Sequence, residues 1–218
     1  MPKVRPLLNA AMAAHLGGVA TKVLRDGTLR FNGDGYGLTV RSAVLEGAFP
    51  RLEFFASAHL DHVGEILARA LHREGPQRQD ISLHFGHREM FSSWGPAYAR
   101  SLSSRDPALL EVMGDDYVGL HVMHLRAILE GEVLPLTRRL AQPAAYDALL
   151  NDAPEAPVPF LHATQRAARG IAVRHLLGGR GLAELIARYE ESLADTLPLV
   201  RVEFDRVRDF LAASSARR

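Results

Sequence analysis

Three pairs of histidines in this sequence share one spacing, with two residues between the members of each pair. The pairs are His59 and His62, His84 and His87, and His121 and His124. Chance placement of ten histidines among 218 positions gives on the order of half a pair at this spacing, so three pairs are an excess. Two imidazoles on one helical face could ligate a metal ion, or one could act as a general base beside a hydrogen-bond donor.

The pair at 121/124 lies in the segment GLHVMHLRAILEG, and the apolar spacing predicts a helix over 117–130. The buried stripe of this helix is predicted to contain Val118, Val122, Leu125 and Leu129. His121 and His124 then lie on the shoulder of the stripe beside Tyr117, because residues three or four apart share a helical face. These three residues, His121, His124 and Tyr117, are the catalytic candidates of the sequence.

A metal site would need more ligands than one histidine pair, since zinc takes three or four and non-haem iron takes two histidines and a carboxylate. The candidate metal ligands are His84, His87, His121, His124 and Asp116. A divalent metal is therefore one hypothesis for a cofactor. The hypothesis that we favour is that the histidines are half-buried packing residues bonded to backbone carbonyls or a tyrosine, with no cofactor bound.

The pair at 59/62 is predicted to lie in a helix over 58–73, where the apolar residues change to a helical period. His59 then falls between Val63 and Ile66 on the apolar face, and His62 lies at the edge of that face. A position on the apolar face fits a packing role for His59 at least as well as it fits binding of a metal ion.

Glycine motifs in the sequence favour turns and caps. Gly33, Gly35 and Gly37 are evenly spaced, unlike the G-x-G-x-x-G-x-V loop of protein kinases, so we expect a tight turn that needs positive φ. The segment GGRG at 178–181 is interpreted in the same way, as the cap of one helix before the next. The sequence contains no G-x-S-x-G, H-E-x-x-H or P-loop motif, so no motif supports hydrolase chemistry.

Composition excludes several classes of site and partner. The chain contains no cysteine, which excludes disulfides, thiolate nucleophiles and Cys-containing metal sites, and favours a cytoplasmic location. The net charge is +1, so no overall positive field supports nucleic-acid binding. No apolar run approaches the roughly 18 residues of a membrane span, so we expect no membrane association.

The order of elements predicts an α+β protein. A helix at 6–16 precedes short extended runs, among them two that flank Asp26-Gly27, a strong hairpin signal. We expect an antiparallel sheet of three to five strands, the last in DISLHFG, packed with a helix-rich C-terminal half. The domains are then a strand-rich part over 1–90 and a helical part over 91–218. In the helical part, the stripe Phe204, Val207, Phe210 and Leu211 should be covered by the domain or by a second copy.

Two classes of function fit these observations. The first is a soluble bacterial protein-binding module, such as an adaptor, chaperone-like or immunity-type protein, whose partner is another protein and which could form a homo-oligomer. It is favoured because the globular organisation is clear while catalytic motifs are absent. The second is a histidine-dependent, metal-assisted enzyme with its site between sheet and helices.

Overall fold

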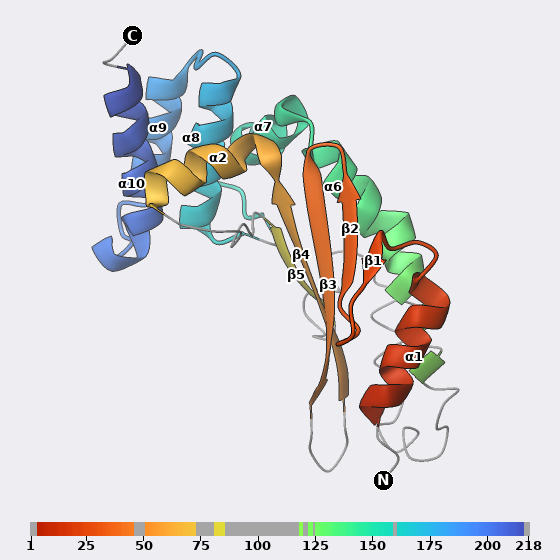
Figure 1. Ribbon diagram of the computed structural model, residues 1–218. Coiled ribbons are helices and arrows are strands. Elements are labelled where there is room, and N and C mark those ends of the chain that lie inside the picture. Colours follow the sequence, from red (N-terminus) through yellow and green to blue (C-terminus); the bar gives the residue numbers. More distant parts are fainter. Residues whose placement is uncertain are drawn as a thin grey trace. The chain divides into compact units, whose positions relative to one another are not determined.

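A computed structural model describes residues 4–45, 51–72, 81–85, 118–119, 122–123, 125–158 and 161–215. It confirms the α+β class, with a sheet that precedes most of the described helices (Figure 1). The chain divides into two compact units. The first consists of Met1–Gly33, Gly37–Ala58 and Ser82–Thr137, and the second of Asp34–Tyr36, His59–Ile81 and Arg138–Arg218. The division of the chain at residue 90 stays a prediction.

The predicted Asp-Gly hairpin opens the sheet. β1 (Lys22–Val23) pairs antiparallel with β2 (Leu29–Gly33). The register places Lys22 opposite Arg30 and Val23 opposite Leu29. Gly27 adopts a φ of 81°, and the Asp26 carboxylate accepts a hydrogen bond of 3.0 Å from the backbone N–H of Thr28. Glycine is favoured at this position because a side chain is strained at positive φ.

The rest of the sheet continues in chain order. β3 (Tyr36–Leu45), β4 (Arg51–Leu60) and β5 (Ile81–Phe85) follow β2, and the strand order is β1-β2-β3-β4-β5. Gly35, with a φ of 74°, makes the turn between β2 and β3. The evenly spaced glycines therefore include the tight turn that the sequence predicts.

One face of the sheet forms a core with the first helix. α1 (Val4–Leu16) lies beside the hairpin (Figure 1) and buries Leu8, Met12 and Leu16, which are four residues apart. In β2, Leu29 and Phe31 are buried while Arg30 is exposed, the alternation of a half-buried strand. Burial of such side chains removes apolar surface from water and stabilises this unit.

The helix predicted over 58–73 begins later than the sequence indicates. β4 continues through His59 to Leu60, and α2 (Asp61–Leu71) starts only at the next residue. His59 is therefore a strand residue and does not lie on the apolar face of a helix. Of the residues predicted on the apolar face, Val63 is buried and Ile66 is half-buried, and Leu67 and Leu71 are buried with them on α2. Strand pairing extended β4 beyond the point where the apolar period changes.

The helix predicted over 117–130 runs on past its predicted end into a further helix. Residues 125–128 are α-helical, the π-helix η1 (Leu129–Val133) follows, and α6 (Leu134–Leu140) continues from it without a break. A π-turn accommodates one extra residue per turn without ending a helix. The Thr137 hydroxyl donates a hydrogen bond of 2.7 Å to the Val133 carbonyl across this join.

The second unit is built around one central helix. α8 (Ala163–Leu176) packs against α2, α7 (Pro143–Asn151), α9 (Leu182–Ser192) and α10 (Pro198–Ser215). Its buried positions include Ala167, Ala168, Ile171 and Ala172, all fully inaccessible. Small side chains allow several helices to approach one helix closely. Phe204, Val207 and Leu211 of α10 are buried as predicted, whereas Phe210 of the same predicted stripe is half-buried, and Gly178 and Gly179 close α8 at positive φ.

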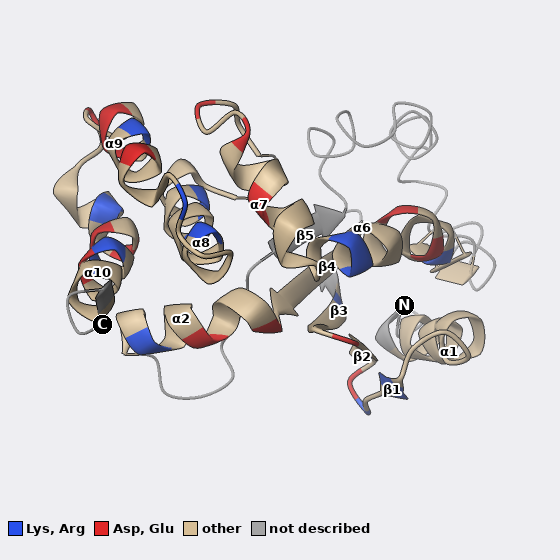
Figure 2. Ribbon diagram, turned by 90° about the horizontal axis from the view of Figure 1, so that it is seen from above, with Lys and Arg blue, Asp and Glu red and all other residues tan. Residues whose placement is uncertain are grey.

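Charges of both signs cover the outer helices of this unit. Figure 2 shows basic and acidic residues interspersed along α9 and α10. Arg208 Nη1 and Glu190 Oε1, 2.8 Å apart, join the two helices. Within the described part of the chain, no helix combines the length and apolar character that crossing a bilayer requires.

Candidate functional site

The structure describes both side chains of one histidine pair, that at 59/62. His59 Nε2 lies 3.6 Å from Asp61 Oδ1, at the junction of β4 and α2. His62 Nε2 lies 2.9 Å from the carbonyl oxygen of Leu140, and its ring centroid lies 5.5 Å from that of Tyr146. The two histidines have different partners. His62 packs as expected of a structural histidine that bonds to a backbone carbonyl.

The other candidates lie outside the described residues or have no described side chain. His87, Asp116, Tyr117, His121 and His124 lie outside the described residues. His84 belongs to β5, of which the backbone is described. In the described ranges, no group of three or more histidines and carboxylates could hold a metal ion. The catalytic and metal-binding roles predicted for these candidate residues stay predictions.

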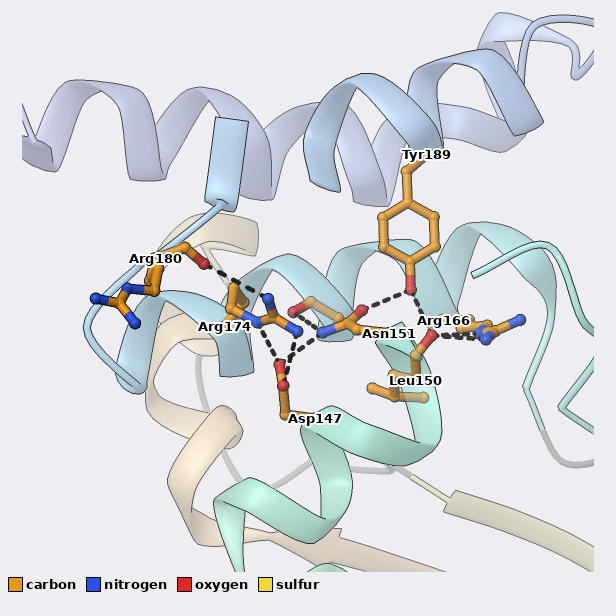
Figure 3. A network of polar contacts seen from close by, with 8 residues as sticks. Asp147, Leu150, Asn151, Arg166, Arg174, Arg180 and Tyr189 are labelled. Atoms are coloured by element: carbon orange, nitrogen blue, oxygen red, sulfur yellow. Dashed lines mark hydrogen bonds and ion pairs between the residues drawn. The ribbon is translucent and has the colours of Figure 1, made fainter. Parts of the chain in front are cut away.

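A buried polar network joins three helices of the second unit (Figure 3). The Tyr189 hydroxyl, on α9, lies 2.8 Å from both the Leu150 carbonyl oxygen and Asn151 Oδ1 on α7. Burial raises the pKa of Tyr189 to about 12, so the hydroxyl keeps its proton at neutral pH and donates it to one of these acceptors.

Asn151 connects this tyrosine to the other two helices. Its Nδ2 atom donates to Asp147 Oδ1 at 2.7 Å and to the Gly170 carbonyl at 2.9 Å. Asp147 in turn accepts two hydrogen bonds from Arg174, from Nε at 2.9 Å and from Nη2 at 2.8 Å. The hydrogen bond to Asp147 raises the pKa of Arg174, as expected of a paired guanidinium. Both N–H groups of the Asn151 amide therefore have acceptors, and its oxygen lies within hydrogen-bond distance of the Tyr189 hydroxyl.

Arg166 holds the segment that follows α7. Its Nε and Nη2 atoms donate to the Leu150 carbonyl at 2.9 and 2.6 Å, and Nη2 also donates to the carbonyl of Ala153. Pro154 and Val158 are buried in the same segment. This segment separates α7 from α8, and Arg166 ties it to α8.

The residues of this network hold helices together. Tyr189 is 1% exposed, and Asn151 and Arg166 are each 4% exposed. A substrate would have to displace packed helices to reach these groups. Satisfied buried hydrogen bonds of this kind fix the relative positions of the elements that they join. The network therefore explains how α7, α8 and α9 are held together.

The start of α10 presents a surface of a different kind. The exposed fractions are 70% for Leu197, 85% for Leu199, 53% for Val200 and 38% for Val202. We call these four residues the apolar surface. The Leu197 carbonyl accepts hydrogen bonds from the N–H groups of Val200 at 2.9 Å and Arg201 at 3.2 Å, which begins the helix. Figure 1 shows this turn at one end of the helical unit.

The sequence contains a signal for this surface that the spacing of the buried residues of α10 does not reveal. Phe204, Val207 and Leu211 define the buried face of α10. At about 100° per residue, Val202 lies on the opposite side of the helix from that face. Leu199, three residues before Val202, lies about 60° from it and shares that side of the helix. Apolar residues outside the buried stripe are thus the feature that predicts an exposed surface.

Tyr189, Asn151 and Arg166 were likewise not among the predicted site residues. Their roles depend on contacts between residues 13 to 39 positions apart, which periodicity does not reveal.

In comparisons with known proteins, the chain matches no protein-family model, no curated protein sequence and no solved structure.

Proposed function

We propose that this protein is a protein-binding module whose contact site is the apolar surface at the start of α10. The observation that carries the proposal is the exposure of Leu199, which is 85%, together with that of its neighbour Leu197. Leu199 and Val202 share one side of α10, and exposed apolar side chains that lie together are characteristic of interaction sites, whereas singly scattered ones are ordinary. Covering such side chains with a partner removes them from water at about 25 cal/mol per Å².

The helix that carries the surface is held firmly in the second unit. Arg169 Nη1, on α8, donates to Glu203 Oε1 on α10 at 2.6 Å, and the arginine is 2% exposed. Phe204 is fully buried, with its ring edge-on to that of Tyr189 at 6.3 Å between centroids. A preformed, rigid surface binds without the entropy cost of ordering its own backbone. The exposed apolar side chains of α10 therefore stand on a helix that is fixed by its own contacts, and this supports a binding role.

The kind of partner follows from the chemistry of the surface. Aliphatic side chains on a helical turn fit the apolar face of a helix or strand from another protein. A cytoplasmic bacterial role, as an adaptor, chaperone-like or immunity-type protein, is part of this proposal. The absence of cysteine supports it, because disulfides are rare in reducing compartments.

A peptide-display library tests the proposal, with binding of the selected peptides measured by fluorescence anisotropy at protein concentrations where the chain is monomeric. Leu199→Glu should weaken binding at least tenfold. Leu176, at the end of α8 and 44% exposed, provides the matched control, and Leu176→Glu should leave binding unchanged. Selection of no peptide, or equal effects of the two variants, would contradict the proposal.

A further inference from the structure

The apolar surface lies between two exposed side chains of opposite charge. Asp195 lies in the turn before Leu197, and Arg206 lies seven residues after Leu199 on α10. Seven residues are close to two full turns, so Arg206 and Leu199 share one face of the helix. Neither Asp195 nor Arg206 forms an ion pair with another described residue. In chain order, an exposed acidic residue therefore precedes the apolar surface and an exposed basic residue follows it, and Arg206 shares the face of Leu199 and Val202.

The neighbouring arginines differ from Arg206, because they have partners within the chain. Arg201 Nη2 lies 3.5 Å from Asp205 Oδ1. Arg208 Nη1 lies 2.8 Å from Glu190 Oε1, and Nη2 lies 2.9 Å from Asp209 Oδ1. Arg206 is thus the charge of this helix that is open to a partner molecule.

An acidic-apolar-basic order is complementary to itself when reversed. In an isologous dimer each contact occurs twice, because residue i meets residue j and residue j meets residue i. We propose that the apolar surface binds the same surface of a second copy of this chain, with the two α10 helices antiparallel. Leu199 and Val202 of one copy pack on those of the other, and each Arg206 faces Asp195 of the other copy. This inference rests on the proposed function, for which it names the partner.

The charges favour a second copy over the other occupants of an apolar surface. An anionic membrane would attract Arg206 but repel Asp195, and a partner of one charge would satisfy only one of the two. Four exposed side chains are fewer than the 20 to 30 residues a side of a standard interface, which buries about 800 Å² per partner. We therefore expect a weak dimer whose population depends on concentration.

Sedimentation velocity of the full chain over a concentration series tests the dimer. Leu199→Glu should weaken dimerisation at least tenfold while the chain stays folded, since an acidic side chain is favourable in the first turn of a helix. Arg206→Glu and Asp195→Arg should each weaken it about tenfold, because each places like charges together twice. The variant that carries both Arg206→Glu and Asp195→Arg should dimerise with a Kd within about threefold of that of the unchanged chain. Its two charges are exchanged and are therefore complementary again.

Leu176→Glu and Arg180→Glu, both on exposed residues outside the surface, are the controls and should leave dimerisation unchanged. A monomer at every concentration, a dimer unaffected by Leu199→Glu, or a double variant as weak as the single variants would overturn the inference. Binding of the monomer to anionic lipid vesicles through Leu199 would also overturn it. A monomer that binds display-selected peptides through Leu199 would overturn the dimer alone and leave the proposed function standing.

Discussion

A Cβ atom on Gly170 would lie 2.6 Å from the hydroxyl oxygen of Tyr189, closer than real Cβ atoms approach a neighbour. It would also collide with Oδ1 of Asn151. The missing side chain on α8 is therefore what allows the tyrosine of α9 and the asparagine of α7 to meet beside it. Close packing of this kind transmits any added volume to the neighbouring helices.

Gly170→Ala should consequently lower the free energy of unfolding by about 1 to 3 kcal/mol, the usual cost of overpacking. Gly131, in the π-helix, has nothing within 4 Å of an added Cβ and is the matched control. Gly131→Ala should be neutral or stabilising by up to about 1 kcal/mol, because alanine restricts the unfolded chain. Urea unfolding of both variants provides the measurement, and equal effects would show that the close approach is not needed.

Tyr189 should make stability fall at alkaline pH. Its folded-state pKa of about 12 lies above the ordinary value of 10.0, because burial disfavours the phenolate. The folded state keeps a proton that the unfolded state releases, so this stabilisation is complete below pH 10 and lost as pH rises through 12. The stability difference between the unchanged chain and Tyr189→Phe should therefore shrink by on the order of 1 to 3 kcal/mol over that range. A difference independent of pH in urea titrations would refute the assignment.

Arg166 should protect the segment 152–158 from proteolysis. Removing its side chain takes away a charged hydrogen-bond donor to the carbonyls of Leu150 and Ala153, at a cost of about 1.5 to 3 kcal/mol. Arg166→Ala should therefore speed cleavage within 152–158, as followed by mass spectrometry of limited digests. Arg180→Ala, a change at an exposed arginine, is the control. Unchanged cleavage in Arg166→Ala would show that other contacts hold the segment.

The Asp147–Arg174 pair should respond to a conservative change that an exposed pair tolerates. Arg174 makes two hydrogen bonds to Asp147, whose side chain is 14% exposed. Lysine cannot reproduce this fork, so Arg174→Lys should cost about 1 to 2 kcal/mol. In the exposed pair of Arg188 and Glu155, at 48% and 68%, Arg188→Lys should change stability by less than about 0.5 kcal/mol. Thermal unfolding at low and high salt distinguishes the two.

The histidine pair at 121/124 is expected to pack without binding a metal. Protein purified without a histidine tag should then contain no stoichiometric metal, and a chelator should leave its melting temperature unchanged. His124→Ala provides the second measurement, because loss of a metal ligand would remove both metal content and any chelator effect. Near-stoichiometric zinc or iron in the purified protein would contradict this prediction and support the metal site.

Features that depend on neighbouring residues could be predicted from the sequence. The hairpin at Asp26-Gly27 follows from the turn preference of that dipeptide, and Gly35 follows from the need for positive φ between two strands. The buried face of α10 follows from the spacing of Phe204, Val207 and Leu211 along one stripe. In each case the physical cause lies within one helix or one turn.

Features that depend on distant residues were decided by the tertiary structure. His59 is on a strand because β4 stays in the sheet up to Leu60, although the local period already favours a helix. The Tyr189 hydroxyl meets Asn151 across 38 positions only because Gly170, on a third helix, leaves room for both. The composition and stripes of this sequence determined an α+β chain with apolar helical faces. Which of those apolar residues are covered, and that Leu199 is not, was decided by how the helices pack, because burial is a property of packed surfaces rather than of residue types.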